Sequence, residues 1–187
     1  MFNSKTKSLL LVSALFWLWT GCTKLPANGD ITGNPPPPPP PDSDYVLSVT
    51  DTSASPADTG ITVNVNLKNI EAVAGAQIRL TYDSTLLSMS SPPFSKPPRA
   101  SQMDFFNGNF STPGVVTFAM TWFSAKGVIP DGEGPILQLR FNVKAGALSG
   151  SQSPLDLADM GININAVSDT LGNLIIPVLT DGLFTVQ

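Results

Sequence analysis

Histidine is absent from this chain of 187 residues, and cysteine occurs once, as Cys22. Without histidine the chain cannot form Ser-His-Asp or Cys-His catalytic arrangements, and it lacks the usual general base and the commonest transition-metal ligand. Glutamate is scarce too, because only Glu71 and Glu133 occur, and most aspartates stand in turn-like contexts, where this residue usually forms turns. No glycine-rich phosphate loop is found between a strand and a helix. We therefore predict a protein that is not an enzyme and that holds no cofactor or metal of its own.

Positive charge is also sparse. The chain has ten lysines and arginines against 14 aspartates and glutamates, for a net charge of −4. The basic residues form no cluster, which argues against nucleic acid and anionic lipid as partners.

Residues 1–21 have the three parts of a secretory signal. Lys5 and Lys7 precede an apolar run from Leu9 to Trp19, and the small residues Thr20 and Gly21 follow it. The run is shorter than the roughly 20 apolar residues that cross a bilayer, and no second such run occurs later. The segment is therefore expected to direct export and to be removed.

The end of this signal, "WTGC", resembles the lipobox of bacterial lipoproteins, with Trp19 where leucine is usual. The resemblance implies cleavage before Cys22 and a diacylglyceryl group on its sulfur, with acyl chains that contribute about 0.8 kcal/mol per buried CH₂. The resemblance also implies the outer membrane, because such lipoproteins are held at the inner membrane by an aspartate where this chain has Thr23. Loss of Lys5 and Lys7 leaves eight basic against 14 acidic residues, a net charge of −6. We expect an exported protein that is lipid-anchored to the bacterial cell envelope, at the outer membrane or cell surface.

Residues 22–44 form a proline-rich linker with few apolar side chains. Seven consecutive prolines, Pro35 to Pro41, favour polyproline II, which rises about 3.1 Å per residue and so extends roughly 20 Å. Such a segment is either a stiff spacer or a ligand for domains that bind proline in aromatic grooves. The spacer is favoured, since those binding domains are uncommon at bacterial surfaces.

Residues 45–187 are predicted to form one all-β domain. Apolar and polar residues alternate with period two, which indicates half-buried strands. This alternation is found in four segments: Ile61–Asn69, Ala76–Asp83, Val116–Met120 and Ile136–Lys144. Turn signals separate the segments, namely "SPADTG", "SPPFSKPP", "FNGN", "PDGEG", "DTLGN" and "TDG". "DTLGN", from Asp169 to Asn173, is interpreted as a hairpin turn, because it lacks the acid density of a calcium loop. With no amphipathic helix, the pattern predicts an antiparallel β-sandwich.

The alternation also assigns side chains to the outer faces of the sheets. Seven residues should point outward: Gln77, Arg79, Thr117, Ala119, Thr121, Gln138 and Arg140. Wherever their strands are neighbours, these side chains would form a polar, slightly basic platform on an acidic protein. A merely solvated sheet face is the alternative.

The order of the segments resembles the cohesin domain. In "VNVNLKNIEAVAGAQIRLTYDSTLLSM", Tyr82, Asp83 and Leu87 match the cohesin pattern Y-D-P-x-V-L, and Ser84 replaces its proline. "GVVTFAMTW", "DGEGPILQLRFNVKAG" and the closing "TDGLFTVQ" resemble later cohesin strands. Together these stretches cover nearly all of residues 45–187, and their order carries the resemblance.

The resemblance implies a nine-stranded jelly roll that binds a partner through one sheet face. The usual partner is a dockerin, a small module whose calcium lies in duplicated EF-hand-like loops. This face and the outward residues of the alternation together indicate Gln77, Arg79, Thr121 and Arg140 as partner-binding residues. Gly75 and Gln77 stand where cohesins of cellulosomes carry Asn and Asp, and Trp122 stands where they carry Glu. Trp122 is either an exposed aromatic anchor at the same site or a core residue.

Three functions remain open. The first is a lipid-anchored surface module that docks a protein partner, such as a dockerin-bearing polysaccharide-degrading enzyme. The second is direct polysaccharide binding through aromatic side chains. Its only aromatic cluster, "MDFFNGNF" with Phe105, Phe106 and Phe110, is a poor sugar platform compared with Trp and Tyr. The third is a structural subunit of a surface assembly.

Overall fold

A computed structural model describes residues 40–123, 127–157 and 164–187 of the chain. The predicted signal, the lipidation site Cys22 and most of the predicted linker lie outside these residues. In the described part, no helix is both long and apolar enough to cross a membrane.

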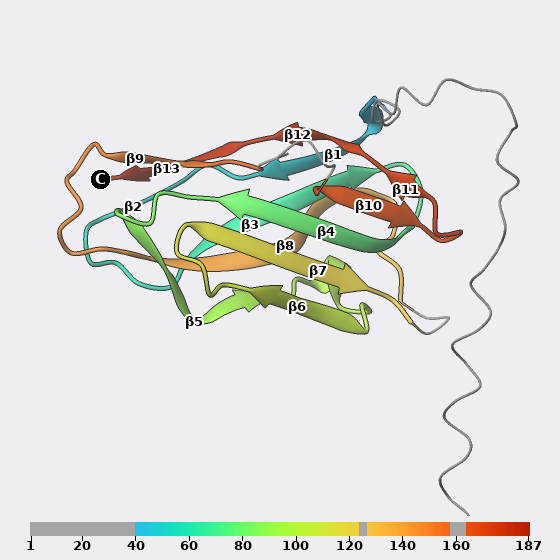
Figure 1. The fold of residues 1–187 in the computed structure, drawn as a ribbon, viewed down its shortest axis with the longest axis horizontal. Coiled ribbons are helices and arrows are strands. Elements are labelled where there is room, and N and C mark those ends of the chain that lie inside the picture. The colour runs from blue at the N-terminus through green and yellow to red at the C-terminus, as the bar shows by residue number, and fades with distance from the viewer. Residues whose placement is uncertain (1–39, 124–126, 158–163) are drawn as a thin grey trace, which may run out of the picture. The chain divides into compact units, whose positions relative to one another are not determined.

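The described residues form thirteen strands in three sheets, with one 3₁₀ turn, η1 (Pro98–Ala100) (Figure 1). The first sheet has the order β12 (Pro177–Thr180), β1 (Asp42–Val49), β3 (Ile61–Asn69), β8 (Gly132–Val143) and β5 (Leu87–Ser95). The second has the order β11 (Leu174–Ile175), β10 (Ala166–Asp169), β4 (Val73–Thr81), β7 (Val115–Thr121) and β6 (Phe105–Asn109). A small third sheet has the order β2 (Thr52–Ala54), β13 (Gly182–Val186) and β9 (Gln152–Leu155).

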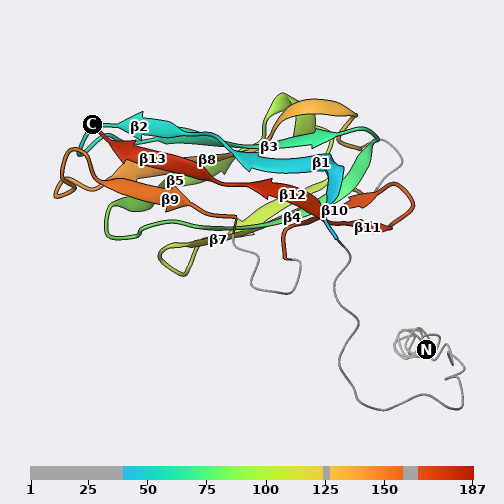
Figure 2. The ribbon, with the colours of Figure 1, turned by 90° about the horizontal axis from the view of Figure 1, so that it is seen from above.

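The four strands predicted from alternation are confirmed as β3, β4, β7 and β8. Along β3 the burial pattern alternates, with Val63, Val65 and Leu67 fully buried and the residues between them partly or largely exposed. The pattern on β7 is the same, around Val116 and Phe118. These inward side chains fill the space between the two five-stranded sheets. Figure 2, seen from above, separates β1 and β3 of the first sheet from β7 of the second. The predicted β-sandwich is therefore confirmed.

The strand count differs from the nine that the cohesin resemblance implied. Thr50 and Asp51 separate β1 from β2, and Asp181 separates β12 from β13. β1 pairs with β12, and β2 with β13; these two pairs are parallel, whereas the other strand pairs of the described residues are antiparallel. If each interrupted strand is joined, and β9 and the two-residue β11 are set aside, nine strands remain. The difference thus comes from breaks in two long strands and from short additions at sheet edges.

Several segments predicted as turns lie wholly or partly inside strands, and the "GEG" of "PDGEG" begins β8. "FNGN" forms most of β6, and its Gly108 pairs with Phe118 of β7. A Cβ at Gly108 would lie 2.6 Å from Phe118 Cδ2, so glycine is present here because the ring covers the backbone. "SPPFS" lies in β5, where the pairing with β8 shifts between Met89 and Phe94. The prolines stand at this irregularity of an edge strand, where a missing N–H is tolerated.

Arg99 ties the η1 turn to the residues before and at the start of β8. Its guanidinium donates hydrogen bonds to five oxygens, four from main-chain carbonyls and one from a side-chain amide. The acceptors are Pro130 O and Gly132 O at 2.8 Å, Gly134 O at 3.2 Å, Leu67 O and Asn69 Oδ1. Asn69 is itself buried, and its Nδ2 donates to Glu71 O and Pro130 O. The Arg99 side chain therefore links η1 by hydrogen bonds to the end of β3 and to the start of β8, although η1 pairs with neither strand.

Candidate functional site

The outward-facing residues predicted on β4 and β7 occupy the outer face of the second sheet. Gln77 is exposed and Arg79 is half-buried, whereas Ala76, Ile78 and Leu80 between and beside them are buried. On β7, Thr117, Ala119 and Thr121 are likewise half-buried, and they alternate with Val116, Phe118 and Met120, which are fully or almost fully buried. The parity argument is therefore confirmed for both strands.

Strand register places these side chains in three rows, because residues directly opposite each other in antiparallel strands point to the same face. The first row runs Leu174, Ser168, Gly75, Thr121, Phe105. The second runs Ala166, Gln77, Ala119, Asn107, and the third Arg79, Thr117, Asn109. We call these three rows the docking face. Ser168, Leu174 and Phe105 were missed at the sequence level, because alternation does not show that β10, β11 and β6 flank β4 and β7.

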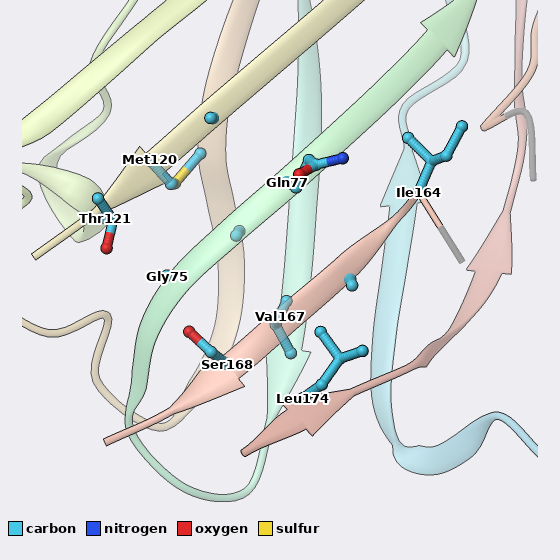
Figure 3. A pocket seen from close by; sticks show the side chains of 11 residues that line it. Gly75, Gln77, Met120, Thr121, Ile164, Val167, Ser168 and Leu174 are labelled. Carbon is cyan, nitrogen blue, oxygen red and sulfur yellow. The ribbon is translucent and has the colours of Figure 1, made fainter. Parts of the chain in front are cut away.

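A shallow depression of about 310 Å³ lies on the docking face (Figure 3). Its floor is made of small side chains: Gly75, Ala119, Thr121, Ala166 and Ser168. Figure 3 shows Ser168 and Thr121 on either side of Gly75, with Leu174 and Ile164 as larger groups at the margin.

Gly75 leaves the floor of the depression open, because glycine has no side chain. A Cβ there would lie 3.0 Å from Ser168 Oγ, 3.3 Å from Met120 O and 3.4 Å from Thr121 Oγ1. The space above Gly75 is thus bounded by two hydroxyl groups. A surface of this kind can accept an apolar side chain of a partner and offer hydroxyl hydrogen bonds at its sides.

Charge is nearly absent from the docking face. Arg79 is the one charged residue in its three rows. The main-chain N–H of Arg79 donates to Asn165 Oδ1 at 2.7 Å, whereas its buried Nε has no hydrogen-bond partner among the described residues. The expected slightly basic platform therefore consists of a single cation on a neutral surface.

Arg140 does not belong to this surface, contrary to the prediction of one shared platform. It lies on β8 in the first sheet, opposite Thr62 of β3, so its side chain is on the other outer face of the sandwich. Gln138 lies there as well. Its Nε2 donates to Asn64 Oδ1 at 3.2 Å and its Oε1 accepts from Ser95 Oγ at 3.1 Å. Alternation correctly assigns which side chains of a strand point outward, but it does not reveal to which sheet the strand belongs.

Trp122 packs against the core, which was one of its two predicted roles. It is half-buried among the core residues, and its Nε1 is buried without a hydrogen-bond partner among the described residues. Trp122 therefore offers no exposed aromatic anchor. The next residue, Phe123, is 76% exposed, and its N–H donates to Asp104 Oδ2 at 2.8 Å.

The phenylalanines of "MDFFNGNF" are mostly used inside the sandwich. Phe106 packs edge-on against Phe118 with ring centroids 4.7 Å apart, and Phe110 stacks on Phe94 at 5.6 Å. Only Phe105 of the cluster is substantially exposed. The flat aromatic strip that direct sugar binding requires is not formed by this cluster.

The residues 169–173 form the predicted hairpin turn between β10 and β11. Asp169 Oδ1 accepts from the N–H groups of Leu171 and Asn173, and Asn173 Nδ2 donates to Asp169 Oδ2 at 2.7 Å. This side-chain bond, with the main-chain bonds, lowers the pKa of Asp169. Gly172 has a φ of +84°, which suits glycine. Within the described residues, no group of three or more His, Cys, Asp or Glu side chains is placed to hold a metal ion.

Comparison with protein families matches the cohesin domain to residues 45–175. The sixth cohesin of scaffoldin B from Acetivibrio cellulolyticus, solved in complex with a mutant dockerin, is 19% identical. The match covers 78% of this chain and 100% of that chain, with a TM-score of 0.67. The OlpA cohesin of Clostridium thermocellum, also solved with a dockerin, is 16% identical over 78% of this chain and 100% of its own, with a TM-score of 0.66.

A non-cellulosomal cohesin from the archaeon Archaeoglobus fulgidus is similar in fold too. It is 15% identical, with coverage of 78% of this chain and 92% of that chain and a TM-score of 0.62. At these identities the structures show a shared fold. A comparison with curated proteins gives no significant match.

Proposed function

This chain belongs to the cohesin family, and from this premise we propose that its domain is a non-catalytic receptor module that binds a protein partner through the docking face. The observation that carries the proposal is the combination of a shallow depression, a floor of small side chains and almost no charge on the second sheet. Such a surface suits a partner that brings its own larger side chains.

The proposed partner is a dockerin-like module, and any calcium is expected in that partner. Two cohesins of similar fold were solved in complex with dockerins, which supports this choice. We further propose that Cys22 carries a lipid and that the proline-rich linker spaces the receptor from the bacterial envelope. A dockerin-bearing polysaccharide-degrading enzyme would then be held at the cell surface. Direct polysaccharide binding is not favoured by any observation, because the phenylalanine cluster packs into the core.

A pair of matched variants tests the docking face. Ala119→Glu places a charged side chain in the second row, and Thr62→Glu places the same side chain on the outer face of the first sheet. The purified protein is titrated calorimetrically with calcium-loaded dockerin modules from the same organism. We expect Ala119→Glu to weaken binding at least tenfold and Thr62→Glu to leave it unchanged.

Thermal unfolding of both variants serves as the folding control. Binding of no dockerin, or equal weakening by the two variants, would contradict the proposal. Mass spectrometry of the protein from its native membrane tests the anchor separately, and an unmodified Cys22 would contradict it.

A further inference from the structure

Exposed large apolar side chains gather at one end of the sandwich. Six such residues are found among the described residues: Ile70, Phe105, Phe123, Leu148, Leu171 and Leu174. Five of these stand at strand ends: Leu171 and Leu174 at the β10–β11 turn, Phe105 at the start of β6, Phe123 after β7 and Ile70 before β4. The strand ends in question are those at the end of the sandwich where β10 and β11 meet, at the right of Figure 1. Leu148 lies in the turn after β8, near the end of β13, to which Gly150 N–H is bonded. We call the group of five the apolar end.

The apolar end continues the docking face. Leu174 and Phe105 close the first row on its two sides, and both are substantially exposed, at 65% and 40%. Leu171 lies in the β10–β11 turn beside Leu174 and is 86% exposed, and Phe123 follows β7 two residues after Thr121. Ile70 lies in the turn that leads into β4, a few residues before Gly75. Leu174 and Phe105 lie on the two edge strands, β11 and β6, so the exposed apolar side chains extend the docking face at both of its margins.

Carboxylates surround this end. The charges of Glu71, Asp42, Asp169 and Asp44 all act on the buried phenol of Tyr45, whose pKa is raised first by burial and then by these groups. Their positions in the fold agree with this, because Asp42 and Asp44 begin β1, Asp169 ends β10, and Glu71 follows Ile70 in the turn before β4.

Among the described residues, the basic side chains of this end, Lys68 and Arg99, are fewer than the carboxylates. Lys68 stands opposite Glu133 in the β3–β8 ladder. The guanidinium of Arg99 donates to five oxygen acceptors, and the carboxylates of Asp131 and Glu133 act on its charge. The apolar end is thus a hydrophobic group of side chains beside a negative rim.

We propose that the apolar end is the anchor of the partner-binding site and that it takes a protein surface with an apolar patch flanked by lysine or arginine. This inference rests on the proposed function, because it extends the docking face to its edge. Opposite charges at the rim raise association rates and select partners. A second copy of the chain fits poorly, because its own carboxylates would meet those of the first copy. Anionic lipid is disfavoured for the same reason.

Two designed helical peptides of equal length serve as probes. Both carry the same leucine face, which is flanked by lysine in one peptide and by glutamate in the other. Binding to the purified protein is followed by fluorescence anisotropy. We expect the lysine peptide to bind with an affinity that falls as salt is raised, and the glutamate peptide to bind at least tenfold more weakly.

The protein offers a matched control for the anchor. The double variant Leu171→Ser, Leu174→Ser removes two exposed leucines from the apolar end, and Leu148→Ser removes one that is 75% exposed at the opposite end. We expect the double variant to lose at least tenfold in affinity for the lysine peptide and Leu148→Ser to bind normally. Equal binding of the two peptides, no binding of either, or the same loss in Leu148→Ser would overturn the inference. A concentration-dependent dimer, or binding to neutral lipid vesicles, that the double variant abolishes would also overturn it.

Failure of the inference is distinguishable from failure of the proposed function. If dockerin binding is sensitive to Ala119→Glu but not to the double leucine variant, the docking face stands and the anchor does not. If the lysine peptide binds at the apolar end but no dockerin binds, the anchor stands and the proposed dockerin partner fails.

Discussion

Replacing Arg99 by methionine should destabilise the domain through the oxygens that are left behind. The variant keeps an unbranched side chain of similar length but removes the guanidinium that donates to five acceptors. The main-chain carbonyls of Pro130, Gly132 and Gly134 would then point toward one another around an apolar side chain. A buried acceptor without a donor costs more than the hydrogen bond contributed.

The size of the effect follows from the surroundings of each bond. The bonds to Pro130 O and Gly132 O are exposed, so these two carbonyls can bind water instead. The bonds to Leu67 O, Gly134 O and Asn69 Oδ1 are partly buried. At about 1 kcal/mol for each of these three, the free energy of unfolding should fall by about 3 kcal/mol. For a domain of this size that corresponds to a decrease in Tm of about 6–12 °C.

Urea and thermal unfolding, followed by circular dichroism, measure this loss. Arg140→Met is the matched control, because no hydrogen bond from the Arg140 side chain is found among the described residues and its Nε is buried without a partner. The control should stay within about 0.5 kcal/mol of the parent protein. Arg99→Lys, which keeps a charge but has fewer donors, should fall between the two. If Arg99→Met costs no more than Arg140→Met, the oxygen shell does not stabilise the fold as argued.

Two further predictions concern Asp156, which follows β9, and Gly108, which packs against the core. Burial raises the pKa of Asp156, and the charge of Asp181 and a hydrogen bond with Asp181 raise this pKa further. The Asp156 carboxyl therefore stabilises the fold at pH values below its unfolded pKa, and this stabilisation is lost as pH rises through its folded pKa. Asp156→Asn should therefore raise Tm at pH 7 but not in strong acid, and a pH-independent difference in Tm would argue against this cause. Gly108→Ala should lower the free energy of unfolding by about 1–3 kcal/mol, because the new Cβ would lie 2.6 Å from Phe118 Cδ2. Gly146→Ala, with no atom within 4 Å of its Cβ, is the control in urea unfolding, and equal costs would rule out the steric explanation.

Local periodicity predicted four of the strands, β3, β4, β7 and β8, and the orientation of their side chains. On β3 and β7 the alternation of residue types reproduces the alternation of burial, because one face of each strand meets the core. "DTLGN" was predicted as a hairpin turn for a local reason as well, since Asp169 binds the N–H groups of its own turn. These features depend on residues that are close in the sequence, so they can be predicted from the sequence alone.

Features that depend on distant segments were not predictable in the same way. Arg140 and Arg79 have the same local pattern, but sheet order places them on opposite faces. Gly108 looks like a turn residue until Phe118 is seen to cover it. Leu174 and Phe105 join the docking face only through the pairing of β11 with β10 and of β6 with β7. The candidate site was therefore predicted in its central strands and missed at both margins.

The position of β1 has a mechanical consequence. It lies between β3 and β12, with four residue pairs on each side and a register shift on the β12 side between Asp42 and Val46, and it begins at Asp42. Under the proposed lipid anchor, tension on a bound partner would enter the domain at the start of this strand, and part of it would act along the strand axis. Tension in that direction loads both ladders in shear, so their hydrogen bonds must break together and not one after another. The strand that follows the linker, β1, is thus held against such a force by hydrogen bonds to both β3 and β12.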